Sequence, residues 1–216
     1  MDPQEPQSKS DVKKMRVNAA INRARRKFVI LFGSVVVGII LVIWLVIWLA
    51  RISNIKPPGD IFANQGQEHV GLEYQYTYNS NPPTSGPHFA SPAMWKVYDY
   101  EVNDKMLIHN LEHGGIWIAY RPGISKKAID DLKNIVTEFG GSQILMEPRA
   151  ANDTDVAVVA WMHLYTFNLN NEKDGLANQQ KQDIRNFYKA LKNHGPEFVP
   201  AMEGIDPQTI PGGVVK

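Results

Sequence analysis

Two histidines with a glutamate between them form the pattern in the sequence that is best suited to chemistry. His109 and His113 are four residues apart, Glu112 lies between them, and Gly114-Gly115 follows at once. On a helix this spacing places both imidazoles on one face, about 5–6 Å apart at Cβ, whereas on a strand they would lie about 13 Å apart. The glycine pair is a strong helix breaker, so we expect a single helical turn or a tight loop that leads into a strand.

Two further histidines lie in loop-forming sequence and could join this pair. His88 ends the stretch NPPTSGPH, residues 81–88, whose three prolines restrict φ and remove hydrogen-bond donors. Such a loop is stiff and would present His88 at a low entropic cost. Imidazoles suit copper and zinc. We therefore predict a transition-metal site, copper before zinc, formed by His88, His109 and His113, with His69 as a fourth candidate ligand.

The sequence leaves open what else such a site contains. There are no cysteines, so thiolate ligands and disulfides are excluded. A thioether from Met94, Met106 or Met162 could complete a site of three imidazoles. Glu112 could bind the ion itself or hold an imidazole through its other N–H.

Two other interpretations compete with a metal site that lacks enzymatic activity. The pattern H-x-x-E-H also occurs in inverted zinc metallopeptidases, where the glutamate, here Glu112, activates water. Gly114-Gly115 counts against this, because such a peptidase needs a long helix here. Alternatively, residues 81–88 and 109–115 could lock together through a buried hydrogen-bond network, as part of a structural or interaction module of a membrane complex.

A hydrophobic segment near the N-terminus predicts a membrane anchor. Residues 28–50 contain no charged side chain and would span about 34 Å as a helix, enough for a hydrocarbon core of about 30 Å. Residues 1–27 carry eight basic and three acidic side chains, whereas residues 51–216 carry fifteen basic and nineteen acidic ones. The positive-inside rule places the basic tail in the cytoplasm.

The chain is therefore expected to be a single-pass protein of the cell membrane. Its parts are a cytoplasmic tail (1–27), a transmembrane helix (28–50), a linker (51–60) and an extracytoplasmic domain (61–216). The expected partners are membrane lipid around residues 28–50 and an unidentified protein. Because the basic residues form a short tail beside a hydrophobic segment, nucleic-acid binding is not expected.

The periodicity after residue 60 predicts an α+β domain. Alternating tyrosines indicate a strand at residues 73–78, and apolar runs indicate strands at 116–120, 143–146 and 155–163. Helical periodicity predicts two amphipathic helices, at residues 125–139 and 178–193. The order matches a ferredoxin-like split β-α-β unit, with two helices packed on an antiparallel or mixed sheet.

Two motifs resemble a family of uncharacterised bacterial and archaeal proteins, the domain-of-unknown-function family 3105. They are NPPTSGPH at residues 81–88 and HNLEHGG at residues 109–115. The resemblance runs from about Gly66 to Glu197, and the extended region 168–182 departs from it. Members of this family are often single-pass membrane proteins or exported proteins. The resemblance therefore implies where the chain is located but no mechanism. The resemblance marks His69, Pro82, Pro83, Ser85, Gly86, His88, His109, Glu112, His113 and Gly114.

Overall fold

The computed structural model describes residues 9–53, 56–170, 175–197, 199 and 202–215. The chain divides into two compact units, Met1–Asn54 and Ile55–Lys216. The first contains one helix, α1 (Lys9–Ser53), in which Val12–Leu49 is long and apolar enough to cross a membrane. Residues 1–8 of the predicted tail (1–27) and residues 54–55 of the predicted linker (51–60) lie outside the described residues.

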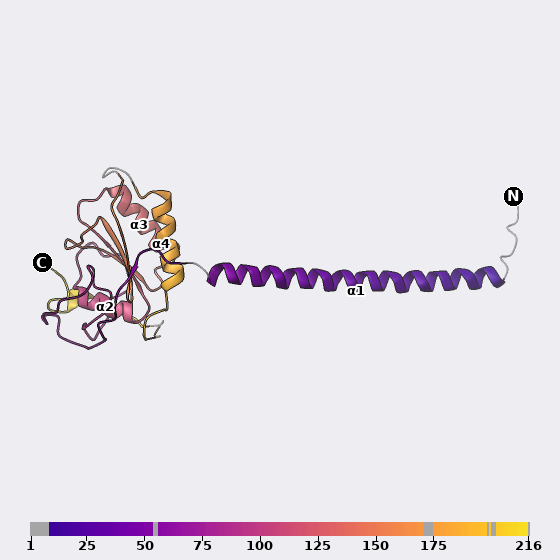
Figure 1. Cartoon of the computed structure of the whole chain (residues 1–216), viewed down its shortest axis with the longest axis horizontal. Coiled ribbons are helices and arrows are strands. Elements are labelled where there is room, and N and C mark those ends of the chain that lie inside the picture. The colour runs from indigo at the N-terminus through magenta and orange to yellow at the C-terminus, as the bar shows by residue number, and fades with distance from the viewer. Residues whose placement is uncertain (1–8, 54–55, 171–174, 198, 200–201, 216) are drawn as a thin grey trace. The chain divides into compact units, whose positions relative to one another are not determined.

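Five strands form one mixed sheet in the second unit (Figure 1). The parallel pair β2 and β3 is joined through α3, while β4 pairs antiparallel with both β2 and β5. The sheet order is β1-β5-β4-β2-β3, so β2 lies inside the sheet. The elements named here are β1 (Asp60–Ile61), β2 (Ile116–Tyr120), α3 (Lys126–Glu138), β3 (Ile144–Pro148), β4 (Val156–Ala160) and β5 (His163–Phe167).

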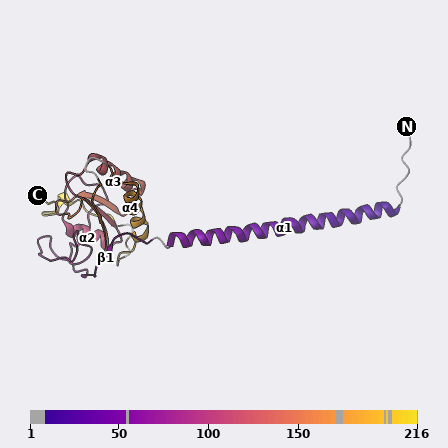
Figure 2. The same ribbon diagram turned by 45° about the horizontal axis from the view of Figure 1, so that its top comes forward.

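Helices cover both faces of this sheet. Helices α3 and α4 (Asn178–Leu191) lie on one face, and α2 (Asp104–Glu112), which carries His109 and Glu112, lies on the other (Figure 2). Neighbouring residues of β2 point to opposite faces, so Ile116 and Ile118 pack with α3 and α4, whereas Trp117 and Ala119 pack with α2. The strand is buried on both sides, which explains its uninterrupted apolar sequence.

The two predicted amphipathic helices of the domain are confirmed. The helix predicted for residues 125–139 is α3, and the side chain of its N-cap residue Ser125 accepts a hydrogen bond from the Ala128 amide at 3.0 Å. The helix predicted for residues 178–193 is α4, which ends at Leu191 and buries its apolar face. The predicted α+β class, with helices packed on a mixed sheet, is therefore confirmed.

Two predicted strands differ from the structure. Residues 73–78 form no strand, and Tyr74 and Tyr76 are exposed. The strand predicted for residues 155–163 ends at Ala160, where the chain turns through Trp161 and Met162 into β5. Met162 has φ of 64°, a rare conformation for a methionine, so the sequence carries no ordinary turn signal there.

The strand order also differs from the expected split β-α-β unit. In a split unit another strand lies between the two parallel strands. Here β2 and β3 are direct neighbours, so β2-α3-β3 is an unsplit crossover. Periodicity predicts which segments are strands, but the choice of pairing partners depends on packing between distant segments.

Glu147 is a carboxylic acid buried on the α2 side of the sheet. One of its oxygens accepts a hydrogen bond of 2.6 Å from the Val102 amide, and the other has no partner within the described residues. Burial raises the pKa of Glu147 well above its usual range, against the lowering effects of the Val102 amide and of Arg149. The folded domain therefore favours the protonated acid.

Replacing Glu147 with glutamine, which mimics the neutral acid, should remove a pH dependence of stability. Because the folded pKa is raised, the stabilising contribution is complete below the unfolded value of about 4.5 and is lost as pH rises towards the folded pKa. The free energy of unfolding of Glu147→Gln should exceed that of the wild type by a margin that grows with pH, by up to about 1.4 kcal/mol per unit. Urea unfolding at several values between about pH 5 and 8 measures this margin, and a constant margin would contradict the assignment.

Candidate metal centre

Helix α2 (Asp104–Glu112) aligns the residues of the histidine motif. The side chain of Asn103 caps its N-terminus, and Gly114, with φ of 76°, ends it. The predicted single helical turn was too short, since α2 has nine residues. The four-residue spacing is helical, and the rings of His109 and His113 stack with their centroids 4.6 Å apart.

His69 and His88 are held side by side by backbone hydrogen bonds between two loops. The His88 amide donates to the Glu68 carbonyl at 2.9 Å, and the Val70 amide donates to the His88 carbonyl at 2.8 Å. The two segments run parallel at this point, and the two rings lie 5.1 Å apart. The proline-rich loop is thereby paired with residues 68–70, which brings a third and a fourth imidazole to α2.

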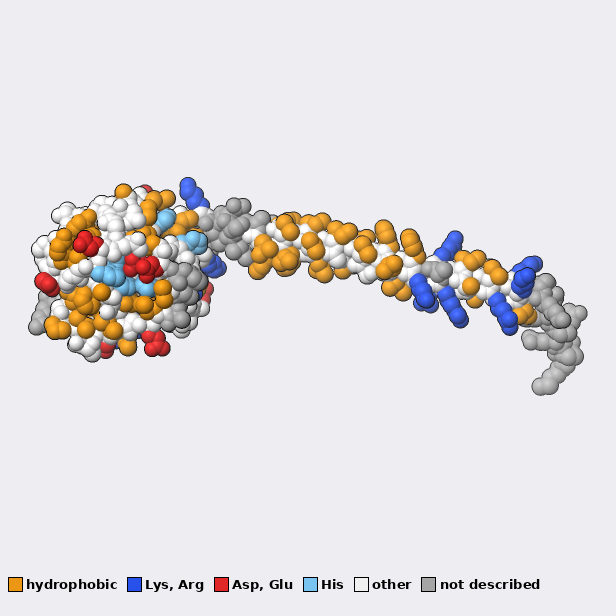
Figure 3. Space-filling model, turned by 90° about the horizontal axis from the view of Figure 1, so that it is seen from below, with side chains coloured by type: hydrophobic (Ala, Val, Ile, Leu, Met, Phe, Trp, Pro, Cys, Tyr) orange, Lys and Arg blue, Asp and Glu red, His pale blue; other side chains and the backbone are white. Residues whose placement is uncertain are grey.

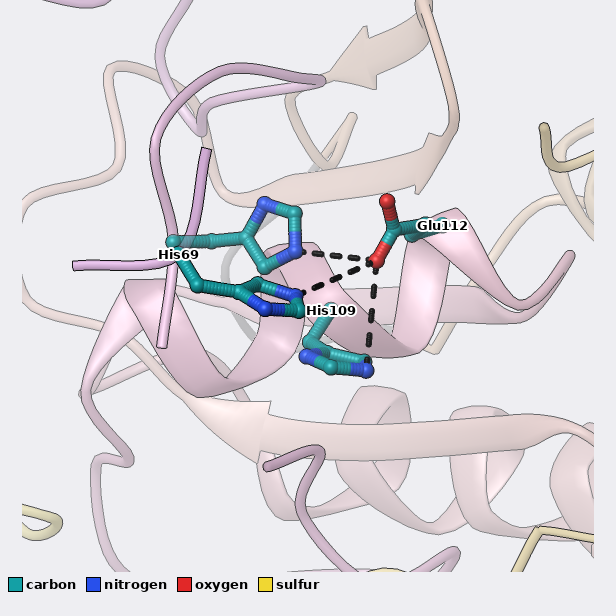
Figure 4. Close-up of side chains that lie close together, drawn as sticks. His69, His109 and Glu112 are labelled. Atoms are coloured by element: carbon teal, nitrogen blue, oxygen red, sulfur yellow. Dashed lines mark hydrogen bonds and ion pairs between the residues drawn. The ribbon is translucent and has the colours of Figure 1, made fainter. Parts of the chain in front are cut away.

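Three imidazoles converge on one carboxylate oxygen of Glu112. The distance from Oε2 to the Nε2 atom is 3.0 Å for His88 and 3.9 Å for both His69 and His109. Figure 4 shows dashed lines that meet at Glu112, among them those from the labelled rings of His69 and His109. A tetrahedral ion with bonds of about 2.0–2.1 Å spaces its ligand atoms about 3.4 Å apart. The observed distances lie on both sides of this value, and the four potential ligand atoms all lie within 4.8 Å of one another. The side chains would therefore have to draw together to hold one ion.

Backbone carbonyls fix the outer nitrogens of two of these rings. Nδ1 of His88 lies 2.8 Å from the Gly86 carbonyl, and Nδ1 of His109 lies 2.7 Å from the Phe89 carbonyl. A carbonyl can only accept, so Nδ1 carries the proton in both rings. In a neutral ring the lone pair is then on Nε2, the atom that faces Glu112. Metal-binding histidines are commonly oriented in this way.

The electrostatics of the cluster favour a neutral His109 beside an ionised Glu112. Burial lowers the pKa of His109 to about 4, with His88 and His113 adding to the effect, although the hydrogen bond to the Phe89 carbonyl opposes it. Burial raises the pKa of Glu112, but the contact with His88 and the hydrogen bond from Gln67 outweigh it, and the pKa lies below its usual value. Near pH 7 His109 and Glu112 therefore have the protonation states that a metal ion requires.

The predicted ligands fall into two neighbouring groups. His69, His88 and His109 gather with Glu112, while His113 belongs with Glu112 and Glu197. The predicted set of His88, His109 and His113 is thus divided, and His69, the fourth candidate, lies in the three-histidine group. The two histidines of the H-x-x-E-H pattern contribute to different groups, unlike a peptidase motif in which both bind one zinc ion.

The sequence interpretation missed two residues that contact these groups. Gln67 donates a hydrogen bond of 2.7 Å to Oε1 of Glu112, and Glu197 lies 3.8 Å from His113. Gln67 lies two residues before His69 in a loop, where no periodicity marks it. Glu197 follows Gly195-Pro196 after the last helix, at the end of the range that resembles the family, and no pattern there marks it as a ligand.

Arg149, a third residue that the sequence did not indicate, joins the segments that carry the candidate ligands. Its guanidinium makes two hydrogen bonds, of 2.9 and 2.8 Å, to the carboxylate of Asp104, the first residue of α2. A further hydrogen bond of 2.7 Å runs to the side chain of Asn81 in the proline-rich loop. Arg149 is buried, so this contact fixes α2 against the loop that ends in His88.

Fold and site together define an α+β domain that encloses a buried cluster of histidine and glutamate, in a chain that also has an N-terminal helix long and apolar enough to cross a membrane. The sequence profile of the family described as "Protein of unknown function (DUF3105)" matches residues 69–203, more than half of the chain. The chain belongs to this family. No curated protein and no solved structure matches it. Both groups of candidate ligands lie inside the matched range.

Replacing Arg149 with glutamine should destabilise the domain by about 3 kcal/mol, because the change leaves Asp104 without its ion-pair partner. Urea unfolding of the full chain in detergent, followed by tryptophan fluorescence, measures the loss. The matched control is Arg185→Gln, which breaks a more exposed pair with Glu138 and should cost less than about 1 kcal/mol. Equal losses in the two variants would show that Arg149 does not join the two segments.

Proposed function

We propose that the protein is a membrane-anchored metal-binding protein whose ion is held by His69, His88, His109 and Glu112. The observation that carries the proposal is the convergence of three Nε2 atoms on one buried carboxylate oxygen, with distances of 3.0–3.9 Å. Its second support is the commitment of Nδ1 in two of the rings to backbone carbonyls, which leaves Nε2 to the ion.

The donor set favours a divalent ion late in the first transition series. Three imidazoles and one carboxylate contain no soft sulfur ligand, so the group suits Cu²⁺ or Zn²⁺ better than Cu⁺. Within such a site Cu²⁺ binds more tightly than Zn²⁺. The hard ions Mg²⁺ and Ca²⁺ prefer an all-oxygen set and would bind weakly.

The half-exposed ring of His69 supports reversible rather than permanent binding. Its side chain is 51% exposed, whereas the side chains of His88, His109 and Glu112 are at most 5% exposed. An ion can therefore reach the site from one side, past the His69 ring. Figure 3 shows histidine side chains at the surface on one face of the domain, next to acidic and hydrophobic ones. This arrangement favours metal handling over a permanently enclosed structural ion.

The apolar surface of α1 supports the membrane anchor. The large hydrophobic side chains between Phe28 and Leu49 are exposed in the isolated chain, and lipid would cover them. The basic side chains Arg25, Arg26 and Lys27 lie directly before this segment. The positive-inside rule therefore places the N-terminus in the cytoplasm and the metal-binding domain outside.

A structural histidine–glutamate network is the second candidate function. The distance of 3.0 Å between Nε2 of His88 and Oε2 of Glu112 suits a hydrogen bond as well as two ligands of one ion. Because Nδ1 of His88 already donates to the Gly86 carbonyl, this hydrogen bond would need a second proton on the ring or one on the carboxylate. A measurement of metal binding distinguishes the metal site from the structural network.

The full chain in detergent, after treatment with a chelator, should bind Cu²⁺ and Zn²⁺ with Kd below about 1 µM, or about 8 kcal/mol, by isothermal titration. His69→Ala should raise Kd at least tenfold without unfolding the domain, since His69 is half exposed. The matched control is His194→Ala, which removes an exposed imidazole outside both groups. Binding no tighter than micromolar in the wild type would leave only the structural network.

The orientation of the anchor can be checked with reporters fused after Lys216. A fused enzyme that is active only outside the cytoplasm should be active, and a fused protein that fluoresces only in the cytoplasm should stay dark. Replacing Arg25, Arg26 and Lys27 with glutamine should reduce this preference. Cytoplasmic fluorescence of the unmodified chain would reverse the proposed orientation.

A further inference from the structure

His113 is a buried imidazole whose ring nitrogens make no hydrogen bond within the described residues. Its side chain is 2% exposed, and neither Nδ1 nor Nε2 has a hydrogen-bond partner within the described part of the chain. A buried polar atom without a partner costs about 1–3 kcal/mol, and native proteins satisfy most such atoms. The cost indicates that another group completes this site.

The segment after α4 brings a carboxylate to His113. The Asn193 amide donates to the Gly114 carbonyl at 2.8 Å, and the Glu197 amide donates to the Glu112 carbonyl at 3.1 Å. Gly195 packs so closely on the end of α2 that a Cβ atom there would overlap the Glu112 carbonyl. Backbone contacts therefore fix the segment, and the Glu197 carboxylate lies 3.8 Å from Nε2 of His113.

This group is continuous with the three-histidine group. One potential ligand atom from each of Glu112, His113 and Glu197 lies within 4.8 Å of the others. Glu112 belongs to both groups, and the stacked rings of His109 and His113 connect them. An ionised carboxylate has about four lone-pair positions on its two oxygens, so Glu112 can accept from Gln67 and still contact two ions.

We propose that Glu112, His113 and Glu197 hold a second divalent ion, which shares the Glu112 carboxylate with the first. This inference rests on the proposed metal site. The two ions of bridged pairs in proteins lie about 3.5–4 Å apart, a separation that one carboxylate can span. One imidazole and two carboxylates form a harder donor set than the first site and suit Zn²⁺, Mn²⁺ or Fe²⁺. Glu197 is half exposed, so the second ion binds more weakly and exchanges more readily.

The test is the number of Zn²⁺ ions bound by the full chain in detergent, measured by equilibrium dialysis and elemental analysis. The wild type should bind two ions per chain, and Glu197→Gln should bind one, with Kd for the second raised at least tenfold. Glu197 is half exposed and held through its backbone, so this variant keeps the fold. The matched control is Glu203→Gln, a change at another exposed glutamate, which should leave two ions bound.

The possible outcomes separate this inference from the proposed function. One ion in both the wild type and Glu197→Gln would overturn the second site and leave the first intact. Two ions in both proteins would also overturn it, because the second ion would then lie elsewhere. No ion in the wild type would overturn both proposals. His69→Ala should weaken the tighter site and leave the weaker one, whereas loss of both at once would show that they are not distinct.

Discussion

The carboxylate of Glu112 lies where a charge is costly, and the surrounding structure compensates for that cost. Its side chain is 2% exposed, and an isolated carboxylate at such a depth would protonate rather than stay charged. The hydrogen bond from Gln67 and the contact with His88 keep its pKa low. The loops that supply these groups are irregular, so their positions depend on backbone pairing and on the Arg149 contacts rather than on a helix or strand of their own.

The parts of the site that could be predicted are those with a local signal. The spacing of His109 and His113 indicated one helical face, and their rings do stack. The prolines before His88 indicated a fixed loop, and that loop pairs with the segment of His69. The pairing itself had no signal, because it joins residues nineteen positions apart through backbone atoms that every residue has. Which imidazoles share a centre therefore could not be inferred from spacing alone.

The same distinction applies to the fold. The helices α3 and α4 were predictable because each carries an apolar stripe of helical period, and α3 also has a capping serine. The turn at Met162 was not, because a methionine with positive φ is stabilised by its surroundings rather than by its own preference. The position of Glu197 could not be predicted either, because it depends on a contact between the end of α2 and a segment more than eighty residues away.

The half-exposed ring of His69 has a kinetic consequence. An ion held only by buried side chains leaves slowly, since the domain must open before any bond to the metal is replaced. An ion bound beside His69 could instead be passed on stepwise, with a ligand from another molecule displacing this one imidazole while the buried groups keep their hold. Affinity and lifetime would then be set by different residues, so that tight retention and rapid transfer could coexist in one domain.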